Sequence, residues 1–283
     1  MNNTDIRSLY GLKYNPFLPD VPPEGLFTIP GTEAFALRVQ SNATRGGFAL
    51  ITGDPGLGKS KTLQQIALQL EKTPDLSVGV MQRPQSNLGD FYRELGELFQ
   101  VGLSPANRYG GFKALRDRWK SHCQSTMLRP VLLIDEAQQV SSACLTELRL
   151  LQSEHFDSQS LLFTLLCGDN RLPERFRCAD LLPLGSRIGP RLVLSPLLPE
   201  QLQGYLRFAI DQAGNAQLMS PEVMQALSAH CASNLRVLNQ MAAELLSAAA
   251  ERNLPQIDES LFFEIFSSTA FKPRRERSRR QAI

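Results

Sequence analysis

Short apolar runs alternate with longer amphipathic segments through the first two thirds of the chain. The runs have lengths suited to buried strands: Phe48–Thr52, Val78–Met81, Val131–Ile134, Leu161–Cys167 and Leu192–Leu194. Segments before and between these runs carry apolar residues at helical spacing: 32–44, 62–70, 88–100, 112–123 and 144–153. Strands that alternate with helices in this way predict an α/β fold built on a parallel five-stranded sheet.

The pattern changes after Pro196. Four segments have a helical period and none has a strand pattern: 199–213, 220–231, 234–252 and 258–266. Ser220 and Pro221 suit a helix cap and first turn, and Asp258 is placed to cap the last helix. We therefore expect four regions: an arm (1–30) packed on the core through Phe17 and Phe27, an α/β core (31–195), an all-helical lid (196–266) and a basic tail (267–283).

A glycine-rich motif, G-x-x-x-x-G-K-S, joins the first predicted strand to the helix that follows it. Gly56 and Gly58 let the backbone N–H groups turn toward phosphate oxygens, and the helix presents its positive end to the same oxygens. Lys59 is placed to reach the β- and γ-phosphates of ATP, and the Ser60 hydroxyl to bind Mg²⁺. A structural turn before a helix is the alternative, but the flanking strand and helix favour a nucleotide site. The expected nucleotide-binding residues are Gly53, Asp54, Pro55, Gly56, Leu57, Gly58, Lys59, Ser60 and Lys61.

An acidic pair follows the apolar run that ends at Ile134. Asp135 is expected at the carboxyl end of a central parallel strand, where such folds bind ligands, and there it can hold Mg²⁺. Glu136 is then placed to orient or deprotonate the attacking water. If the acidic pair stood alone, a helix N-cap would explain it. Together with the glycine-rich motif, the pair indicates an NTPase.

Composition and charge narrow the class of protein. The 283 residues are 42% hydrophobic and 20% charged, as in globular proteins. No apolar run approaches the length of a membrane helix and the first residues lack an apolar signal, so we expect a soluble, cytoplasmic protein. Five cysteines without a C-x-x-C pair argue against a disulfide framework or a zinc site. The whole chain carries +2, but residues 272–280 alone carry +5, which suits either a nucleic-acid contact or a solvated end.

The chain resembles the AAA+ ATPases of the ExeA-type and transposition-helper (TniB/TnsC-like) group. The clearest stretch runs VLLIDEAQQVSSACLTELRLLQSEHFDSQSLLFTLLCGDNRLPERF from Val131, with Asn15-Pro16-Phe17 as a further match. The resemblance covers most of residues 10–266, and it implies a P-loop AAA+ core that hydrolyses ATP with Mg²⁺, followed by a helical lid.

The resemblance also implies roles for polar residues outside the two nucleotide motifs. Asp169 falls at the sensor-1 position, with Asn170 as the alternative because a neutral residue is more usual there. Arg187 falls where the group carries an arginine finger that reaches a neighbouring subunit's ATP, with Arg191 as the alternative. A finger supplied in trans implies self-assembly into a ring or a helical filament.

Arg236 resembles sensor 2, which couples the lid to the nucleotide, although Ser233 replaces the glycine often found before this motif. A surface ion pair is the alternative interpretation for each of these arginines.

The first functional hypothesis is an ATP-dependent, DNA-binding regulator of transposition. The resemblance implies that it binds target duplex DNA and recruits a DDE-type transposase, with a separate target-selection protein as a further partner. Basic residues occur at Arg108 and through Lys113–Lys120. The matching candidates for DNA phosphate contacts are Arg83, Lys113, Arg116 and Arg118, and a solvated helix face is the alternative for each.

Two other hypotheses remain open. One is a secretion-associated ATPase, as ExeA-type proteins can be; those carry a membrane segment and a cell-wall-binding region, and the present residues hold neither, so we expect no membrane partner. The other is a nucleotide-gated scaffold with little turnover, which the presence of both Lys59 and Glu136 disfavours.

Overall fold

The computed structural model describes residues 3–81, 87–103 and 107–269, and it divides the chain into two compact units. The sheet unit spans Thr28–Pro196, and the helical unit joins the residues up to Phe27 to those from Leu197 onward. Arg83 and the basic residues of 272–280 lie outside the described residues.

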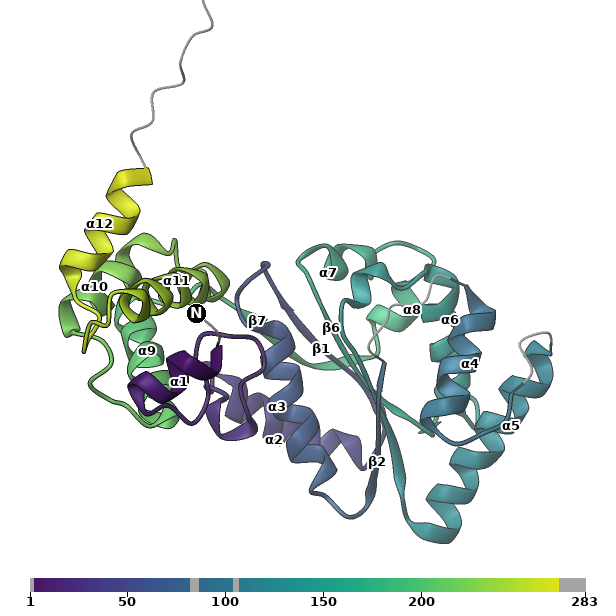
Figure 1. Ribbon diagram of the computed structural model, residues 1–283. Helices are drawn as coiled ribbons and strands as arrows, with labels where there is room; N and C mark the ends of the chain where they lie inside the picture. The colour runs from purple at the N-terminus through teal and green to yellow at the C-terminus, as the bar shows by residue number, and fades with distance from the viewer. Residues whose placement is uncertain (1–2, 82–86, 104–106, 270–283) are drawn as a thin grey trace, which may run out of the picture. The chain divides into compact units, whose positions relative to one another are not determined.

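A parallel five-stranded sheet forms the centre of the sheet unit, in the order β2-β3-β6-β1-β7 (Figure 1). The central strands β3, β6 and β1 read as continuous apolar runs because both faces of the sheet are covered. The predicted α/β fold with five parallel strands is confirmed. The strands are β1 (Gly47–Gly53), β2 (Leu76–Met81), β3 (Arg129–Ile134), β6 (Phe163–Gly168) and β7 (Ile188–Leu194), with a separate antiparallel hairpin of β4 (Ser153–Glu154) and β5 (Gln159–Ser160).

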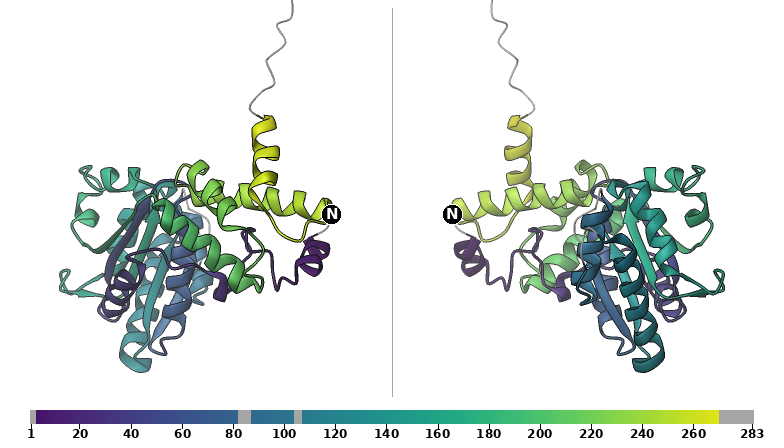
Figure 2. Two further views of the ribbon diagram at one scale, coloured as in Figure 1. Left: turned by 90° about the vertical axis from the view of Figure 1, so that its left-hand side faces the viewer. Right: turned by 90° about the vertical axis from the view of Figure 1, so that its right-hand side faces the viewer.

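Helices pack on both faces of this sheet (Figure 2). One face carries α2 and α3, which contact β1 and β6. The other carries α4, α5 and α6, whose core side chains join Phe48, Leu132 and Trp119 in one apolar cluster. The helices of this unit are α2 (Thr32–Ala43), α3 (Lys59–Glu71), α4 (Leu88–Leu98), α5 (Arg108–Ser121), α6 (Ser142–Gln152), α7 (Arg171–Arg175) and α8 (Leu182–Gly185), with short turns η2 (His122–Thr126) and η3 (Ala137–Gln139).

The helical unit contains α1 (Asn3–Tyr10), η1 (Pro23–Gly25), α9 (Pro199–Ala213), α10 (Pro221–His230), α11 (Leu235–Glu251) and α12 (Glu259–Thr269). Two predicted caps are confirmed. The Ser220 hydroxyl accepts from the Val223 N–H at 3.4 Å, and Asp258 Oδ1 accepts from the Leu261 N–H at 3.0 Å.

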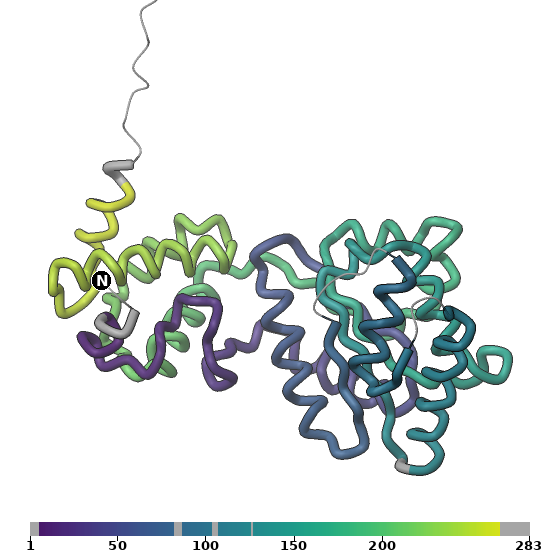
Figure 3. Tube along the Cα trace, turned by 45° about the vertical axis from the view of Figure 1, so that its right-hand side comes forward, coloured from purple at the N-terminus to yellow at the C-terminus, as the bar shows by residue number. Residues whose placement is uncertain are grey.

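The N-terminal arm differs from its expected placement on the nucleotide-binding core. Its residues up to Phe27 belong to the helical unit, and they run beside α9 and α11 (Figure 3). The Tyr10 hydroxyl donates to the Leu254 carbonyl oxygen at 2.9 Å, and the Phe27 ring packs edge-on against Tyr205 at 5.4 Å between centroids. The arm therefore buries its aromatic residues against the helices that follow the sheet unit in sequence.

Candidate nucleotide-binding site

The phosphate loop connects the end of β1 at Gly53 to the start of α3 at Lys59. Gly56 and Gly58 have φ values of 86° and 92°, the left-handed region that a side chain disfavours. A Cβ at Gly53 would lie 2.9 Å from the Leu194 carbonyl oxygen, so β7 approaches too closely for any other residue. These three glycines are needed for the curl of the loop and for its fit against β7.

Lys59 is the buried cation of this loop. Its side chain is 8% exposed, and its Nζ donates to the carbonyl oxygens of Gly53 at 2.9 Å and Asp54 at 3.0 Å. Ser60 is exposed in the first turn of α3, beside Lys61, whose Nζ donates to Gln64 Oε1 at 3.1 Å. The Lys59 side chain therefore folds back over the phosphate loop and binds its backbone.

Sheet register brings the acidic pair next to the phosphate loop. Ile134 of β3 pairs with Leu166 of β6, and Cys167 of β6 pairs with Ile51 of β1, so the three strands end side by side. Asp135 Oδ1 accepts from the Glu136 N–H at 2.9 Å, and Glu136 itself has a φ of 49°. Burial, followed by the negative charge of Asp135, raises the pKa of the Cys167 thiol. This thiol therefore stays neutral beside the carboxylate.

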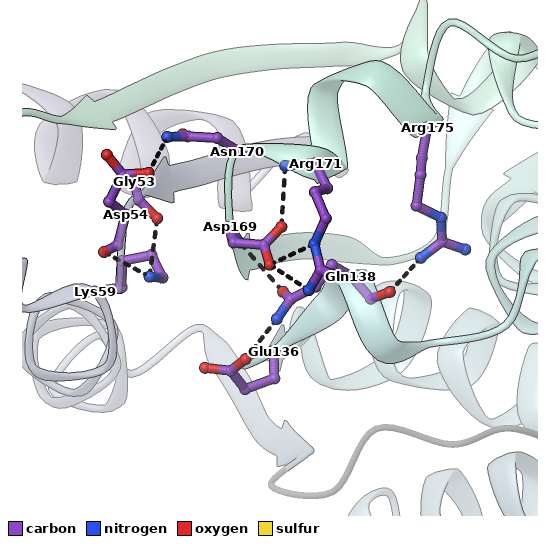
Figure 4. Close-up of polar contacts among 9 residues, drawn as sticks. All are labelled: Gly53, Asp54, Lys59, Glu136, Gln138, Asp169, Asn170, Arg171 and Arg175. Atoms are coloured by element: carbon purple, nitrogen blue, oxygen red, sulfur yellow. Dashed lines mark hydrogen bonds and ion pairs between the residues drawn. The ribbon is translucent and has the colours of Figure 1, made fainter. Parts of the chain in front are cut away.

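The residues after β6 complete the site (Figure 4). The Asn170 Nδ2 donates to Asp54 Oδ1 of the phosphate loop at 2.6 Å. Asp169 instead faces Arg171, which donates from its backbone N–H at 3.0 Å and from Nε at 2.8 Å. These hydrogen bonds hold the pKa of the Asp169 carboxyl below its usual range. Of the two sensor-1 candidates, Asn170 is the one whose side chain contacts the phosphate loop.

The arrangement fits a nucleoside triphosphate. A loop with two left-handed glycines ends at a helix N-terminus, which is a site for phosphate oxygens, and Lys59 supplies a cation there. The Ser60 hydroxyl and the Asp135 carboxylate are oxygen donors of the kind that Mg²⁺ prefers.

The sequence of this region matches a known domain family. Residues 42–176, which include β1, the phosphate loop, the acidic pair and β6, match the AAA domain family. Residues 42–176 are an AAA domain. This match agrees with the P-loop ATPase core that the sequence predicted.

The chain is also similar to the General secretion pathway protein A of Aeromonas hydrophila. The two are 30% identical over 253 residues, which make up 88% of this chain and 45% of the relative. The chain thus spans less than half the length of this curated relative.

Several solved structures have the same fold. CDC6P from Pyrobaculum aerophilum aligns with a TM-score of 0.67 and 16% identity, over 86% of this chain and 67% of that one. ORC2 from Aeropyrum pernix, solved with ADPNP and ADP, aligns with a TM-score of 0.70 and 15% identity. The alignment covers 89% of this chain and 71% of ORC2. ORC1 from Aeropyrum pernix, solved with DNA, aligns with a TM-score of 0.65 and 19% identity. The alignment covers 90% of this chain and 68% of ORC1. At these identities the likeness establishes the AAA+ fold alone.

The two finger candidates, Arg187 and Arg191, do not contact the nucleotide site of their own chain. Because Phe48 pairs with Ile188 and Gly53 with Leu194, Arg187 is at the opposite end of the sheet from the phosphate loop, roughly 20 Å along the strand direction. Arg187 pairs with Asp157, and Arg191 Nη2 donates to the Gly185 carbonyl oxygen at 3.2 Å. Neither arginine therefore acts as a finger for a nucleotide bound to its own subunit.

Arg236 lies in the helical unit, in the first turn of α11, and its side chain is exposed. Ser233 before it has a φ of 57°, the conformation that the glycine it replaces would adopt readily. The sensor-2 role of Arg236 stays a prediction.

The DNA-contact candidates on α5 have different surroundings. Lys113 and Arg118 are exposed, whereas the Arg116 side chain is 14% exposed. Arg116 Nη1 donates to the Leu151 carbonyl oxygen at 2.9 Å, and its Nη2 pairs with Glu154. Arg116 therefore ties α5 to the end of α6, and we withdraw it as a DNA contact.

Three polar residues near the acidic pair have no role in the sequence analysis: Gln138, Arg171 and Arg175. Gln138 is part of the Asp135–Gln138 string that marked the resemblance, so a signal existed for it. Arg171 pairs with Asp169, two residues away, whereas Arg175 reaches backbone carbonyl groups that only the register of β3 against β6 brings near.

The described residues contain no helix with both the length and the apolar character of a membrane span.

Proposed function

We propose that this chain is an ATP-hydrolysing switch that assembles on duplex DNA in its ATP state and regulates transposition by recruiting a DDE-type transposase. The observation that carries the enzymatic part is the convergence of Lys59, Asp135 and Glu136 at the carboxyl ends of three adjacent strands. This is where parallel-sheet proteins bind and transform nucleotides.

Each residue of the site has its own task. Lys59 and the loop N–H groups bind the phosphates of ATP. Ser60 and Asp135 would hold Mg²⁺, which would neutralise charge on the transferred phosphoryl group. Glu136 orients the attacking water and accepts its proton. Arg187 stabilises charge at the γ-phosphate of a neighbouring subunit, so hydrolysis depends on self-assembly into a ring or filament.

The DNA-binding part is supported by exposed cations and by the fold. Lys113 and Arg118 stand exposed on α5, and residues 272–280 add a strongly basic segment. ORC1 from Aeropyrum pernix, which has the same fold, has been solved with DNA. Contacts of this kind would be made to phosphates, so binding would tolerate many sequences and weaken with salt.

Binding of labelled duplex DNA tests the proposal. It is measured without nucleotide, with ATP and with a slowly hydrolysed ATP analogue, each at two salt concentrations. We expect binding that requires ATP, persists with the analogue and weakens in high salt. Glu136→Gln should abolish turnover and keep the ATP-bound, DNA-bound oligomer, whereas Lys59→Ala should lose nucleotide and DNA together.

A secretion role is the second candidate, because the 30% identical relative is a general secretion pathway protein. DNA binding that fails in every nucleotide state, with ATP turnover intact, would overturn the transposition proposal and favour this one.

A further inference from the structure

The side chain of Gln138 bridges the acidic pair and the residue that follows β6. Its Nε2 donates to Glu136 Oε2 at 2.5 Å, and its Oε1 accepts from the Asp169 N–H at 3.2 Å (Figure 4). The two ends of the amide cannot be exchanged, because a carboxylate only accepts and a backbone N–H only donates. The amide orientation is therefore set by its partners.

The backbone around Gln138 is also held in place. Arg175 of α7 donates from Nη1 to the Gln138 carbonyl oxygen at 2.6 Å and from Nη2 to the Val140 carbonyl oxygen at 2.9 Å. These two bonds join the middle of the short turn η3 and the residue that follows it to α7. Gln138 thus extends from a fixed support.

Gly168, the last residue of β6, makes room for this bridge. A Cβ at this position would lie 2.5 Å from Gln138 Oε1 and 3.0 Å from Leu172 Cδ2. A larger residue would displace the amide from the Asp169 N–H. Glycine is therefore the residue that fits between β6, the Gln138 amide and α7.

We propose that Gln138 is a positioning residue that fixes the carboxylate of Glu136 for ATP hydrolysis and links it to the segment that contacts the phosphate loop. The bond to Oε2 occupies one carboxylate oxygen and leaves Oε1 to take a proton from water. Through Asp169, the same amide is joined to Asn170, which contacts Asp54. Movement of the phosphate loop is thereby coupled to the orientation of Glu136. This inference rests on the proposed role of Glu136 as the base.

Paired methionine variants separate a positioning role from a structural one. Gln138→Met keeps the length of the side chain but removes both hydrogen bonds, and Gln139→Met makes the same change at the exposed neighbour. We expect Gln138→Met to lower kcat about 10- to 100-fold with KM for ATP unchanged, because a displaced reacting group loses rate rather than substrate binding. Gln139→Met should match the wild type, and nucleotide binding by both variants verifies that they are folded.

A glutamate at the same position gives a second readout. Gln138→Glu keeps the length of the side chain but replaces the amide by a carboxylate, which cannot donate a hydrogen bond to Glu136. We expect kcat to fall as in Gln138→Met, again with KM for ATP unchanged. A defect that was merely structural would also weaken ATP binding.

The proposal is overturned if Gln138→Met or Gln138→Glu retains wild-type kcat while Glu136→Gln has lost turnover. Full turnover in Glu136→Gln is a different result, because it would remove the base itself and with it the proposed catalytic function.

Discussion

Arg187 forms an ion pair with Asp157, which lies in the turn between β4 and β5. Three successive residues of this turn have positive φ values: His155 at 48°, Phe156 at 54° and Asp157 at 72°. A positive φ costs conformational energy in residues other than glycine. The Phe156 side chain in this turn is fully exposed. The proposed finger is therefore held by an acid of its own subunit, and the pair must open before Arg187 can reach a neighbour.

Removing each partner of this pair should have opposite consequences. Arg187→Ala should lower ATP turnover of the assembled protein by about 10³-fold, because a finger in trans stabilises the transferred phosphoryl group. Asp157→Asn should keep turnover at or above the wild-type rate and change stability by less than about 1 kcal/mol, since the pair is about one third exposed. Steady-state ATPase assays at several protein concentrations measure both. Normal activity in Arg187→Ala would transfer the finger role to Arg191, which the same assay on Arg191→Ala can establish.

The buried carboxylate of Glu147 should contribute to stability. This side chain is 3% exposed and accepts from the Tyr92 hydroxyl at 2.5 Å and from Arg108 Nε at 3.1 Å. Glu147→Gln should lower the free energy of unfolding by about 2 kcal/mol, because charge-assisted hydrogen bonds between α4, α5 and α6 are lost. Glu264→Gln is the matched control. Its pair with Arg252 is exposed, so the change should be within about 0.5 kcal/mol.

The same carboxylate should make stability depend on pH. Burial raises the pKa of Glu147, but hydrogen bonds from Arg108 and Tyr92 outweigh it and leave the pKa below its ordinary value. A lowered pKa means that the contribution is present above the unfolded pKa of about 4.3 and is lost as pH falls through the folded value. Denaturant unfolding between pH 6 and pH 3 should therefore show a smaller loss of stability for Glu147→Gln than for the wild type. Parallel curves would exclude Glu147 as the source.

Ser233→Gly should stabilise the helical unit. Ser233 has a φ of 57°, which glycine adopts without the steric cost of a side chain. We expect a gain of about 1 kcal/mol in thermal or denaturant unfolding, and Ser233→Ala, which keeps the Cβ, should show none. An equal gain in both variants would mean that the serine hydroxyl, and not the backbone, sets the energy.

Cations on α5 should separate into DNA-binding and structural residues. The double change Lys113→Ala and Arg118→Ala should weaken duplex binding and make the slope of log K against log salt less negative by about 1 for each phosphate that is no longer neutralised. Arg116→Ala should instead lower the melting temperature, because Arg116 joins α5 to the carbonyl groups of α6. An unchanged salt slope in the double variant would leave residues 272–280 as the basic segment to test by deletion.

Local signals predicted most of the fold. The apolar runs identified the strands, and β7 is the informative exception: the sequence indicated only Leu192–Leu194, whereas the strand begins at Ile188. Pro190 and Gly189 interrupt its apolar pattern, and they are tolerated because β7 is an edge strand of the sheet. The β4–β5 hairpin was missed because its residues are polar and lack alternation.

The sequence predicted the parts of the candidate site whose residues are contiguous in the chain. The phosphate loop is such a part, because its glycines, its lysine and the start of α3 are contiguous. The bonds of Gln138 to Asp169 and of Asn170 to Asp54 join segments far apart in the chain, and only strand register brings them together. The expected placement of the arm on the nucleotide-binding core was wrong for a related reason, since its aromatic residues gave no indication of which apolar surface would receive them.

The position of β1 has a consequence for synthesis on the ribosome. This strand ends at Gly53, but both of its hydrogen-bonded neighbours come much later, since β6 begins at Phe163 and β7 ends at Leu194. At about 5–20 residues per second, translation needs roughly 5 to 30 s to cross that interval. During this time the nascent β1 is an apolar strand with both edges unpaired, the state in which chains aggregate or are held by chaperones. The nucleotide pocket is thus assembled late and in one cooperative step, after the chain around Leu194 has emerged.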